Sequence, residues 1–236
     1  MRVARSLVFG AAAATLALSS LAVPAAAVER GALAIVNGRP GGKVDICLNG
    51  TELRSKVPYG GKVYATPVIG EKVLRVFAPD PRRCKGTLLA KRTFTLGIGA
   101  DITLVVNKVA PKVVQFDNTT PNMGEIPPDG APLPNTLMAW RHAADLGTVH
   151  LFYVSNPSPV APADADPLTW EEGDHAEYSH VPGTRTYLFV TRPGQSQVLA
   201  QSRIVTMLAS HRYEFYLLGT SAANAKFVVL DREVSN

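Results

Sequence analysis

The feature that most constrains the fold is an internal repeat. Residues 37–48 align without gaps on residues 142–153, and in each copy a short apolar strand leads into a polar turn and a second strand. The match continues through four further pairs of segments: 68–77 with 181–190, 88–96 with 198–206, 102–106 with 213–217, and 113–117 with 227–231. A unit that occurs twice is expected to fold within each copy, so the sequence predicts two similar domains.

Each copy has the composition of a small β-sandwich. Val, Thr, Tyr and Phe recur in short runs, and Gly and Pro separate these runs. About six or seven short strands per copy, divided by turns, are typical of this architecture. The predicted fold class is therefore all-β, with two tandem immunoglobulin-like or prealbumin-like β-sandwich domains after a signal peptide.

The first 27 residues resemble a secretory signal. Arg2 and Arg5 give a positive start, residues 7–23 are apolar, and Ala27 ends a run of small residues that suits cleavage. An uncleaved membrane anchor is the alternative, but the apolar run is short for a bilayer span of roughly 20 residues. No later stretch is long and apolar enough to span a membrane, so we expect a secreted or extracytoplasmic protein without a span in its mature chain.

These observations divide the chain into four segments. Residues 119–134 contain five prolines, which exclude a central strand and indicate a stiff, extended linker. One large sandwich with an internal Pro-rich loop is the alternative. The predicted boundaries are a signal peptide at 1–27, a first sandwich at 28–118, a linker at 119–135 and a second sandwich at 136–236.

Several motifs resemble those of the DUF4397 domain. Residues 44–50 (VDICLNG) look like the VDVYVNG strand and turn of that family, residues 141–145 (RHAAD) like its VHASPDAP opening, and residues 181–190 (VPGTRTYLFV) like its LPAGTYTLRV hairpin. The first copy departs from the pattern, because Asn37 stands where His is usual. The resemblance implies an exported bacterial protein with tandem immunoglobulin-like units, and it supplies no catalytic site.

The two cysteines, Cys47 and Cys84, both lie in the first copy. An even number of cysteines in an exported chain indicates a disulfide. The turn after Phe77 is longer in the first copy, and its extra residues 80–85 bring Cys84, so the second copy lacks both cysteines together. We expect this disulfide to stabilise the fold by roughly 4 kcal/mol. A redox pair is the alternative, but the spacing is not Cys-x-x-Cys.

The charge is shared unequally between the copies. Residues 28–118 carry 15 basic and 7 acidic side chains, whereas residues 136–236 carry 7 basic and 10 acidic ones. The mature net charge of +3 is too small to indicate nucleic-acid binding. The basic copy could attract an anionic cell-envelope polymer, lipid headgroups, another envelope protein or the acidic second copy. A solvated surface that keeps the protein soluble is the simpler interpretation.

The longest difference between the copies is the acidic loop 155–174. Its carboxylates could hold Ca²⁺, but they lack the spacing of an EF-hand. His175 and His180 would face opposite sides of a continuous strand, so a zinc site lacks ligands. We therefore expect no metal and a solvated loop, with Trp170 covering the domain edge. The possible binding loop comprises Asp164, Asp166, Trp170, Glu171, Glu172, Asp174 and His175.

Common catalytic motifs are missing. The sequence has no Gly-x-Ser-x-Gly elbow and no His-Glu-x-x-His, and Gly97-Ile-Gly99 lacks the third glycine of a dinucleotide site. All five histidines lie in the second copy, and His142 is expected to hydrogen-bond the backbone of its turn. The sequence thus predicts an exported, non-enzymatic binding or structural module without a cofactor. The alternative is a secreted hydrolase with a dispersed catalytic site, which would need Ser, His and Asp converging in a pocket.

Overall fold

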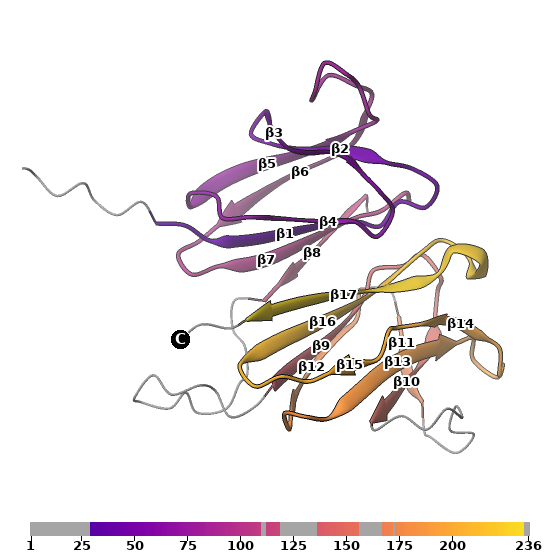
Figure 1. Cartoon of the computed structure of the whole chain (residues 1–236). Helices are drawn as coiled ribbons and strands as arrows, with labels where there is room; N and C mark the ends of the chain where they lie inside the picture. Colours follow the sequence, from indigo (N-terminus) through magenta and orange to yellow (C-terminus); the bar gives the residue numbers. More distant parts are fainter. Residues whose placement is uncertain (1–28, 110–111, 119–135, 156–166, 172, 234–236) are drawn as a thin grey trace, which may run out of the picture.

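Figure 1 shows the computed structural model, which describes residues 29–109, 112–118, 136–155, 167–171 and 173–233. Over these residues the protein is all-β, apart from one turn of 3-10 helix, η1 (Ala222–Asn224). The predicted signal peptide and the predicted linker lie outside the described residues. No helix within the described part of the chain has the length and apolar character needed to cross a membrane.

The first eight strands form a sandwich of two four-stranded sheets. The inner sheet has the order β4-β1-β7-β8 and the outer sheet the order β3-β2-β5-β6. β1 and β7 run parallel, whereas β5 and β6 form an antiparallel hairpin. The strands are β1 (Ala32–Asn37), β2 (Val44–Leu48), β3 (Thr51–Val57), β4 (Lys62–Ala65), β5 (Gly70–Phe77), β6 (Leu88–Leu96), β7 (Asp101–Val106) and β8 (Val113–Asp117).

The second sandwich repeats this arrangement. Its inner sheet has the order β12-β9-β16-β17, and its outer sheet has the order β11-β10-β13-β14, with β15 also pairing with β13. The strands are β9 (Thr136–His142), β10 (Val149–Ser155), β11 (Leu168–Trp170), β12 (His175–His180), β13 (Arg185–Thr191), β14 (Val198–Gln201), β15 (Val205–Thr206), β16 (His211–Leu218) and β17 (Lys226–Glu233).

The two sandwiches share one strand order, and this confirms the predicted fold class. β9 to β14 take the places of β1 to β6, and β16 and β17 take those of β7 and β8. Even an irregularity recurs. The pairing of β5 with β6 shifts between Val76 and Phe77, and the pairing of β13 with β14 shifts between Val190 and Thr191.

The sequence alignment of β5 with β13 is wrong by one residue. It placed Leu74 against Tyr187, but in the structure Leu74 pairs with Leu48, and Leu188 pairs with the equivalent Tyr153. The side chains of Leu74 and Leu188 both lie in the cores. A shift of one residue turns a strand's side chains to the opposite face. The run TYLFV is apolar throughout, so its sequence does not reveal which face is buried.

Each sandwich has its own apolar core between its two sheets. On β16, Tyr213, Phe215 and Leu217 point into the second core, whereas Tyr216 and Leu218 point to the other face. β7 shows the same alternation. Strands that are apolar on both faces have to be covered on both faces, and the inner sheets are therefore expected to meet another layer.

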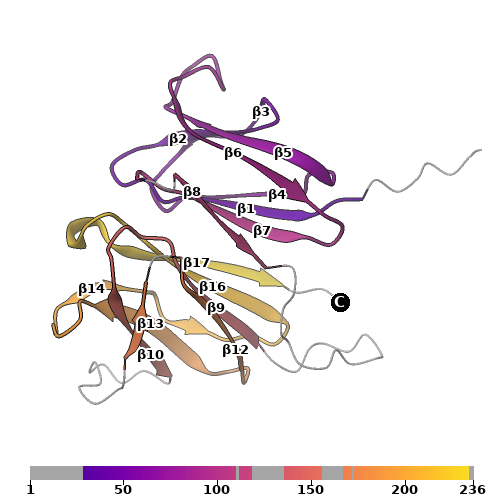
Figure 2. The same ribbon diagram turned by 180° about the vertical axis from the view of Figure 1, so that it is seen from behind.

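The inner sheets cover each other. The four sheets stack as four layers, with β4-β1-β7-β8 facing β12-β9-β16-β17 (Figure 1, Figure 2). The halves thus have separate cores and share a third apolar cluster at their contact. This cluster contains Ala34, Val36, Val105 and Phe116 from the first sandwich and Ala143, Tyr216, Leu218, Val228 and Leu230 from the second.

Charged side chains are buried beside this shared cluster. Glu214 is fully buried, 2.9 Å from Arg212 and 3.3 Å from Arg232. Arg232 also pairs with Asp101 of the first sandwich. Asn118, at the end of the first sandwich, accepts hydrogen bonds from Arg212 at its backbone oxygen (2.8 Å) and its Oδ1 (3.2 Å). Buried charges need such partners because their desolvation is costly.

The contact between the sandwiches is reciprocal. Arg212 occupies the position of Asp101 in its sheet, and Arg232 occupies that of Asn118. Each of the two contacts, Asp101–Arg232 and Asn118–Arg212, therefore joins one of these positions in one sandwich to the other position in the other sandwich. This exchange is the pattern of a two-fold interface. The second sandwich supplies the arginines and the first an aspartate, which is the reverse of their net charges. The attraction of a basic first copy for an acidic second copy does not account for this contact.

Candidate functional site

A row of functional groups crosses the outward face of the outer sheet of the first sandwich. Cys47 on β2 pairs with Glu52 on β3 and with Arg75 on β5. Directly opposed residues on neighbouring strands point to the same face, so a carboxylate, a sulfur and a guanidinium lie side by side. Asn49 and Gly50 make the adjoining turn with φ of 50° and 83°, a conformation that the Asn-Gly pair favours.

The long loop between β5 and β6, residues 78–87, covers this row. Cys84 in the loop forms a disulfide with Cys47, with the Cα atoms 6.1 Å apart. The predicted disulfide is thus confirmed. The loop buries Cys47 completely, although this residue points away from the core. Arg83 and Lys85 flank Cys84 and are exposed to solvent.

A buried carboxylate also fastens the loop. Asp45 is 1% exposed and accepts hydrogen bonds from the backbone N–H of Asp80 in the loop (3.0 Å) and of Lys56 on β3 (2.8 Å). Arg83 and Cys84 have left-handed backbone conformations, with φ of 48° and 49°. Such conformations are unfavourable for residues other than glycine, so the loop depends on these ties to keep its shape.

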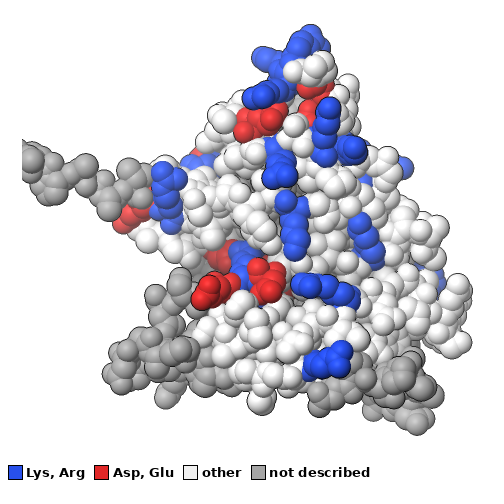
Figure 3. Space-filling model, viewed as in Figure 1, with Lys and Arg blue, Asp and Glu red and all other residues white. Residues whose placement is uncertain are grey.

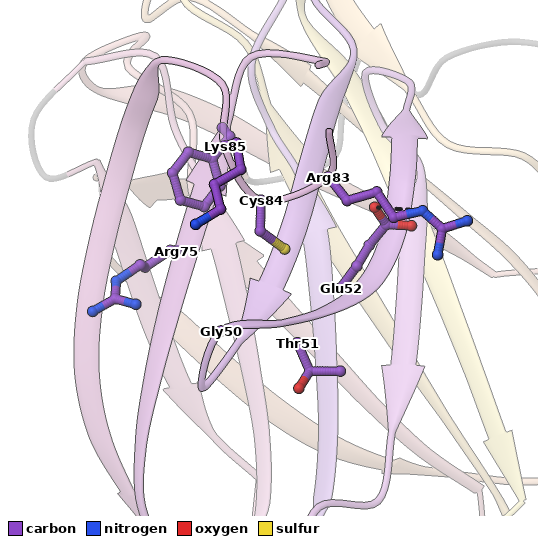
Figure 4. Close-up of a pocket in the computed structure, with 8 residues that line it drawn as sticks. Gly50, Thr51, Glu52, Arg75, Arg83, Cys84 and Lys85 are labelled. Carbon is purple, nitrogen blue, oxygen red and sulfur yellow. Dashed lines mark ion pairs between the residues drawn. The ribbon is translucent and has the colours of Figure 1, made fainter. Parts of the chain in front are cut away.

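Between the row and the loop lies a hollow of about 400 Å³ (Figure 4). Arg75 and Lys85 lie on one side of Cys84, and Glu52 and Arg83 lie on the other. Three cationic groups against one carboxylate give the recess a positive potential, which suits an anionic ligand group. The recess is lined by Gly50, Thr51, Glu52, Arg75, Phe77, Arg83, Cys84 and Lys85.

The cations on one side of the recess are available to a ligand. Asp80 is held within the loop by Arg82, 3.1 Å away, and this hydrogen bond lowers the pKa of the Asp80 carboxyl. Within the described part of the chain, Arg75 and Lys85 have no ion-pair partner. An anion entering the recess would therefore meet two cations that no acid neutralises.

The recess lies within a broadly basic face. Figure 3 shows Lys and Arg side chains spread over the first sandwich from its tip to the join, with Asp and Glu gathered near those two ends. The exposed basic residues of β3, β6 and the loop are Arg54, Lys56, Arg82, Arg83, Lys85 and Lys91. Such a surface concentrates anions near the recess.

The sequence pattern alone did not reveal a role for Glu52, Arg75 or Lys85. The available signal was the extra segment 80–85, which brings three basic residues together with Cys84 into the first copy alone. The pairing of Cys47 with both neighbouring strands then fixes Glu52 and Arg75 beside it. That register could not be read from the sequence.

The predicted binding loop of the second sandwich is only partly described. Trp170 is 4% exposed and belongs to the second core, so it covers the domain edge, as the sequence analysis favoured. Glu171, Asp174 and His175 are exposed, and Asp174 accepts a hydrogen bond from the Glu171 N–H at 2.8 Å. Among the described residues, no three His, Cys, Asp or Glu side chains gather to hold a metal. Outside those residues lie Asp164, Asp166 and Glu172.

His142 hydrogen-bonds the backbone of its turn, as the sequence predicted. Its Nδ1 accepts a hydrogen bond from the N–H two residues later (3.3 Å), and its Nε2 lies 3.2 Å from the carbonyl oxygen five residues later. Nε2 therefore carries the proton. In the first sandwich, Asn37 makes the same two bonds, at 3.0 and 3.1 Å. Burial lowers the pKa of His142, so the ring is neutral and structural.

One histidine–carboxylate pair deserves comparison with a hydrolase site. His211 Nδ1 lies 2.8 Å from Asp231 Oδ1. A hydrolase would also need a nucleophile and a pocket at this pair. Neither the recess described above nor a second hollow of about 250 Å³ contains His211 or a serine. The pair therefore gives the hydrolase alternative no support. The second hollow is lined by Val114, Gln115, Phe116, Asp117, Arg141, Gly173 and His175.

No family model and no curated protein matches the chain, so the resemblance to DUF4397 stays a prediction. Several solved structures are weakly similar. A CBM26 carbohydrate-binding module of Eubacterium rectale Amy13K, solved with maltoheptaose, is 11% identical, covers 87% of this chain and 98% of its own, and has a TM-score of 0.25. A proposed cell adhesion protein from Bacteroides uniformis is 14% identical, with 86% and 97% covered and a TM-score of 0.27. Another from Bacteroides ovatus is 10% identical, with 89% and 98% covered and a TM-score of 0.26. Because these scores are low, the function has to be judged from the residues of this chain.

Proposed function

We propose that this protein is an exported, non-catalytic binding module of the cell envelope whose first sandwich binds anionic groups of an envelope polymer. The observation that carries the proposal is that three basic residues, Arg75, Arg83 and Lys85, line one recess. Export is supported by the predicted signal peptide and by the Cys47–Cys84 disulfide, because disulfides persist in oxidising compartments.

A recess binds an anion better than a flat basic surface does. A single exposed ion pair contributes little, about 0–1 kcal/mol, whereas several donors around one anionic group form stronger, charge-assisted hydrogen bonds. The disulfide and Asp45 hold the loop in place before the ligand arrives. Less conformational entropy is therefore lost on binding.

The test measures binding of the purified protein to polygalacturonate at low and at high ionic strength. We expect binding that weakens with salt, and a loss of roughly tenfold in affinity, about 1.4 kcal/mol, when Arg75→Gln and Lys85→Gln are combined. The matched control combines Lys43→Gln with Arg54→Gln, which removes the same charge from exposed positions outside the recess.

The control decides between a recess and a diffuse basic face. If the control variant loses as much affinity as the recess variant, general surface charge governs binding and the recess has no special role. If the unmodified protein binds no polyanion even at low ionic strength, the proposed function is wrong.

A further inference from the structure

Glu52 is an unexpected residue in a recess that suits anions. Its side chain is 17% exposed, and its Oε2 is buried and accepts no hydrogen bond, although Arg83 Nε lies 4.0 Å away. A buried carboxylate oxygen without a hydrogen bond destabilises the protein. Because Oε2 is closed to solvent, a ligand reaches this carboxylate at Oε1, which also accepts no hydrogen bond from the described residues.

The recess therefore has two chemically different ends. Glu52 and Arg75 stand on either side of Cys47, two strand spacings apart, which places their backbones about 10 Å from each other. Figure 4 shows Arg75 and Lys85 at one end and Glu52 at the other. Thr51, next to Glu52, adds a hydroxyl group to the lining. One end thus offers hydrogen-bond donors with positive charge, and the other offers an acceptor.

We infer that the recess takes an anionic group with hydroxyls beside it, as found in an acidic sugar or a polyol phosphate. The carboxylate or phosphate binds to Arg75 and Lys85, and a ligand hydroxyl donates to Glu52 Oε1. This inference rests on the proposed function, because it specifies the ligand of the same recess. A polycarboxylate without hydroxyls would satisfy only one end, and a neutral glucan only the other.

The experiment compares the affinities of the purified protein for four polymers at one ionic strength. Polygalacturonate and poly(glycerol phosphate) carry both kinds of group, polyacrylate carries carboxylates without hydroxyls, and dextran carries hydroxyls without charge. We expect the first two to bind roughly tenfold more tightly per charge than polyacrylate, the ratio that one hydrogen bond to a charged group gives. Dextran should not bind. The first two polymers also show whether a carboxylate or a phosphate is preferred.

Glu52→Ala supplies the sharper test, because its two effects have opposite signs. Removing a negative charge from the recess should strengthen the binding of polyacrylate. Losing the acceptor should weaken the binding of polygalacturonate and poly(glycerol phosphate) severalfold. The control is Glu71→Ala, an exposed acid on β5 outside the recess, which should strengthen the binding of all three polyanions slightly.

The two proposals fail in different ways. The inference is wrong if Glu52→Ala strengthens the binding of all polyanions equally. It is also wrong if polyacrylate binds as tightly as the hydroxylated polymers. In both cases the proposed anion-binding function stands. If dextran binds as tightly as polygalacturonate, the negative charge of the ligand is not recognised, and both the inference and the proposed anion-binding function are wrong. If no polymer binds, the proposed function fails with it. Circular dichroism and an intact disulfide in each variant show that the fold is retained.

Discussion

The two sandwiches have the same strand order, but they use equivalent positions of their outer sheets differently. In the first, Cys47 and Arg75 pair on the outward face beneath a disulfide-bonded loop. In the second, the equivalent pair is Phe152 and Phe189, whose rings stack with centroids 4.6 Å apart and planes 3° apart. Tyr187 extends this stack, with its ring 6.1 Å from that of Phe189.

This difference shows which residues the fold needs and which it leaves open. The inward residues of both sheets are apolar in both copies, whereas the outward row is covalent and charged in one copy and aromatic in the other. An aromatic pair adds about 0.5–1.5 kcal/mol beyond its burial, and a disulfide typically adds about 2–4 kcal/mol. In the first sandwich the disulfide provides this stabilisation without aromatic side chains covering the outward face. Arg75 therefore stays available to a ligand.

The largest effect is expected from removing the disulfide. Cys47→Ser with Cys84→Ser should lower the free energy of unfolding by about 4 kcal/mol, because a 37-residue separation in the chain is no longer closed. The loop should also lose its left-handed conformation at Arg83, and polyanion binding should fall with it. Urea unfolding and the polygalacturonate assay measure the two consequences.

The matched change in the second sandwich is Phe152→Leu with Phe189→Leu. It removes the ring stack but keeps apolar side chains, so we expect a loss of about 1 kcal/mol and unchanged polyanion binding. Equal losses in the two double variants would mean that the two outward rows stabilise the sandwiches to the same extent. Retained binding in the double serine variant would show that the disulfide is not needed to form the recess.

The next effect concerns the join, where the two sandwiches contribute different charges. Glu214→Gln leaves Arg212 and Arg232 without their buried carboxylate, and removing one partner of a buried ion pair costs about 3–5 kcal/mol. Asp101 still pairs with Arg232, so we expect the lower end of this range, about 3 kcal/mol. In calorimetry we expect the second sandwich of the variant to unfold at a lower temperature than in the unmodified protein, because Glu214 and both arginines belong to that sandwich.

Glu233→Gln is the control, since Glu233 is exposed at the end of β17. It should change the free energy of unfolding by less than about 0.5 kcal/mol. A Glu214→Gln protein that unfolds like the control would mean that the buried carboxylate does not stabilise the join, and that the apolar cluster and the remaining polar contacts suffice.

The sequence predicted the all-β class because the repeated runs of apolar residues and turns are local features. The disulfide was predictable as well, since Cys84 arrives within an insertion in the first copy. The repeat also indicated the role of His142, because its position opens the same turn as Asn37. These features depend on neighbours in the chain or on the comparison of two copies.

The features that the sequence did not predict depend on register or on the partner sheet. The shift of one residue in β13 is hidden because Tyr187 and Leu188 are both apolar. The arginines of the join, such as Arg212, are typical surface residues in sequence and become buried only when the inner sheets stack. Arg75 gains its role from its pairing with Cys47, which is a long-range contact between strands.

The smallest effect compares the two turns that open the sandwiches. Asn37 and His142 make the same backbone hydrogen bonds, but only His142 can be protonated. Burial lowers its pKa below the value of about 6.5 of a solvated histidine. The unfolded chain therefore takes up this proton at a higher pH than the folded protein does. The stability that neutral His142 contributes is therefore complete above about pH 6.5 and is lost as the pH falls.

His142→Asn should keep both hydrogen bonds and abolish this part of the pH dependence, whereas His142→Ala should cost about 1 kcal/mol at neutral pH. Urea unfolding between about pH 7.5 and pH 5 measures both effects. Asn37→His is the reciprocal change, and it should give the first sandwich the pH dependence that the second one loses. A slope that persists unchanged in His142→Asn would assign the pH dependence to another histidine of the second sandwich. His142 and Asn37 would then be equivalent in charge as well as in hydrogen bonding.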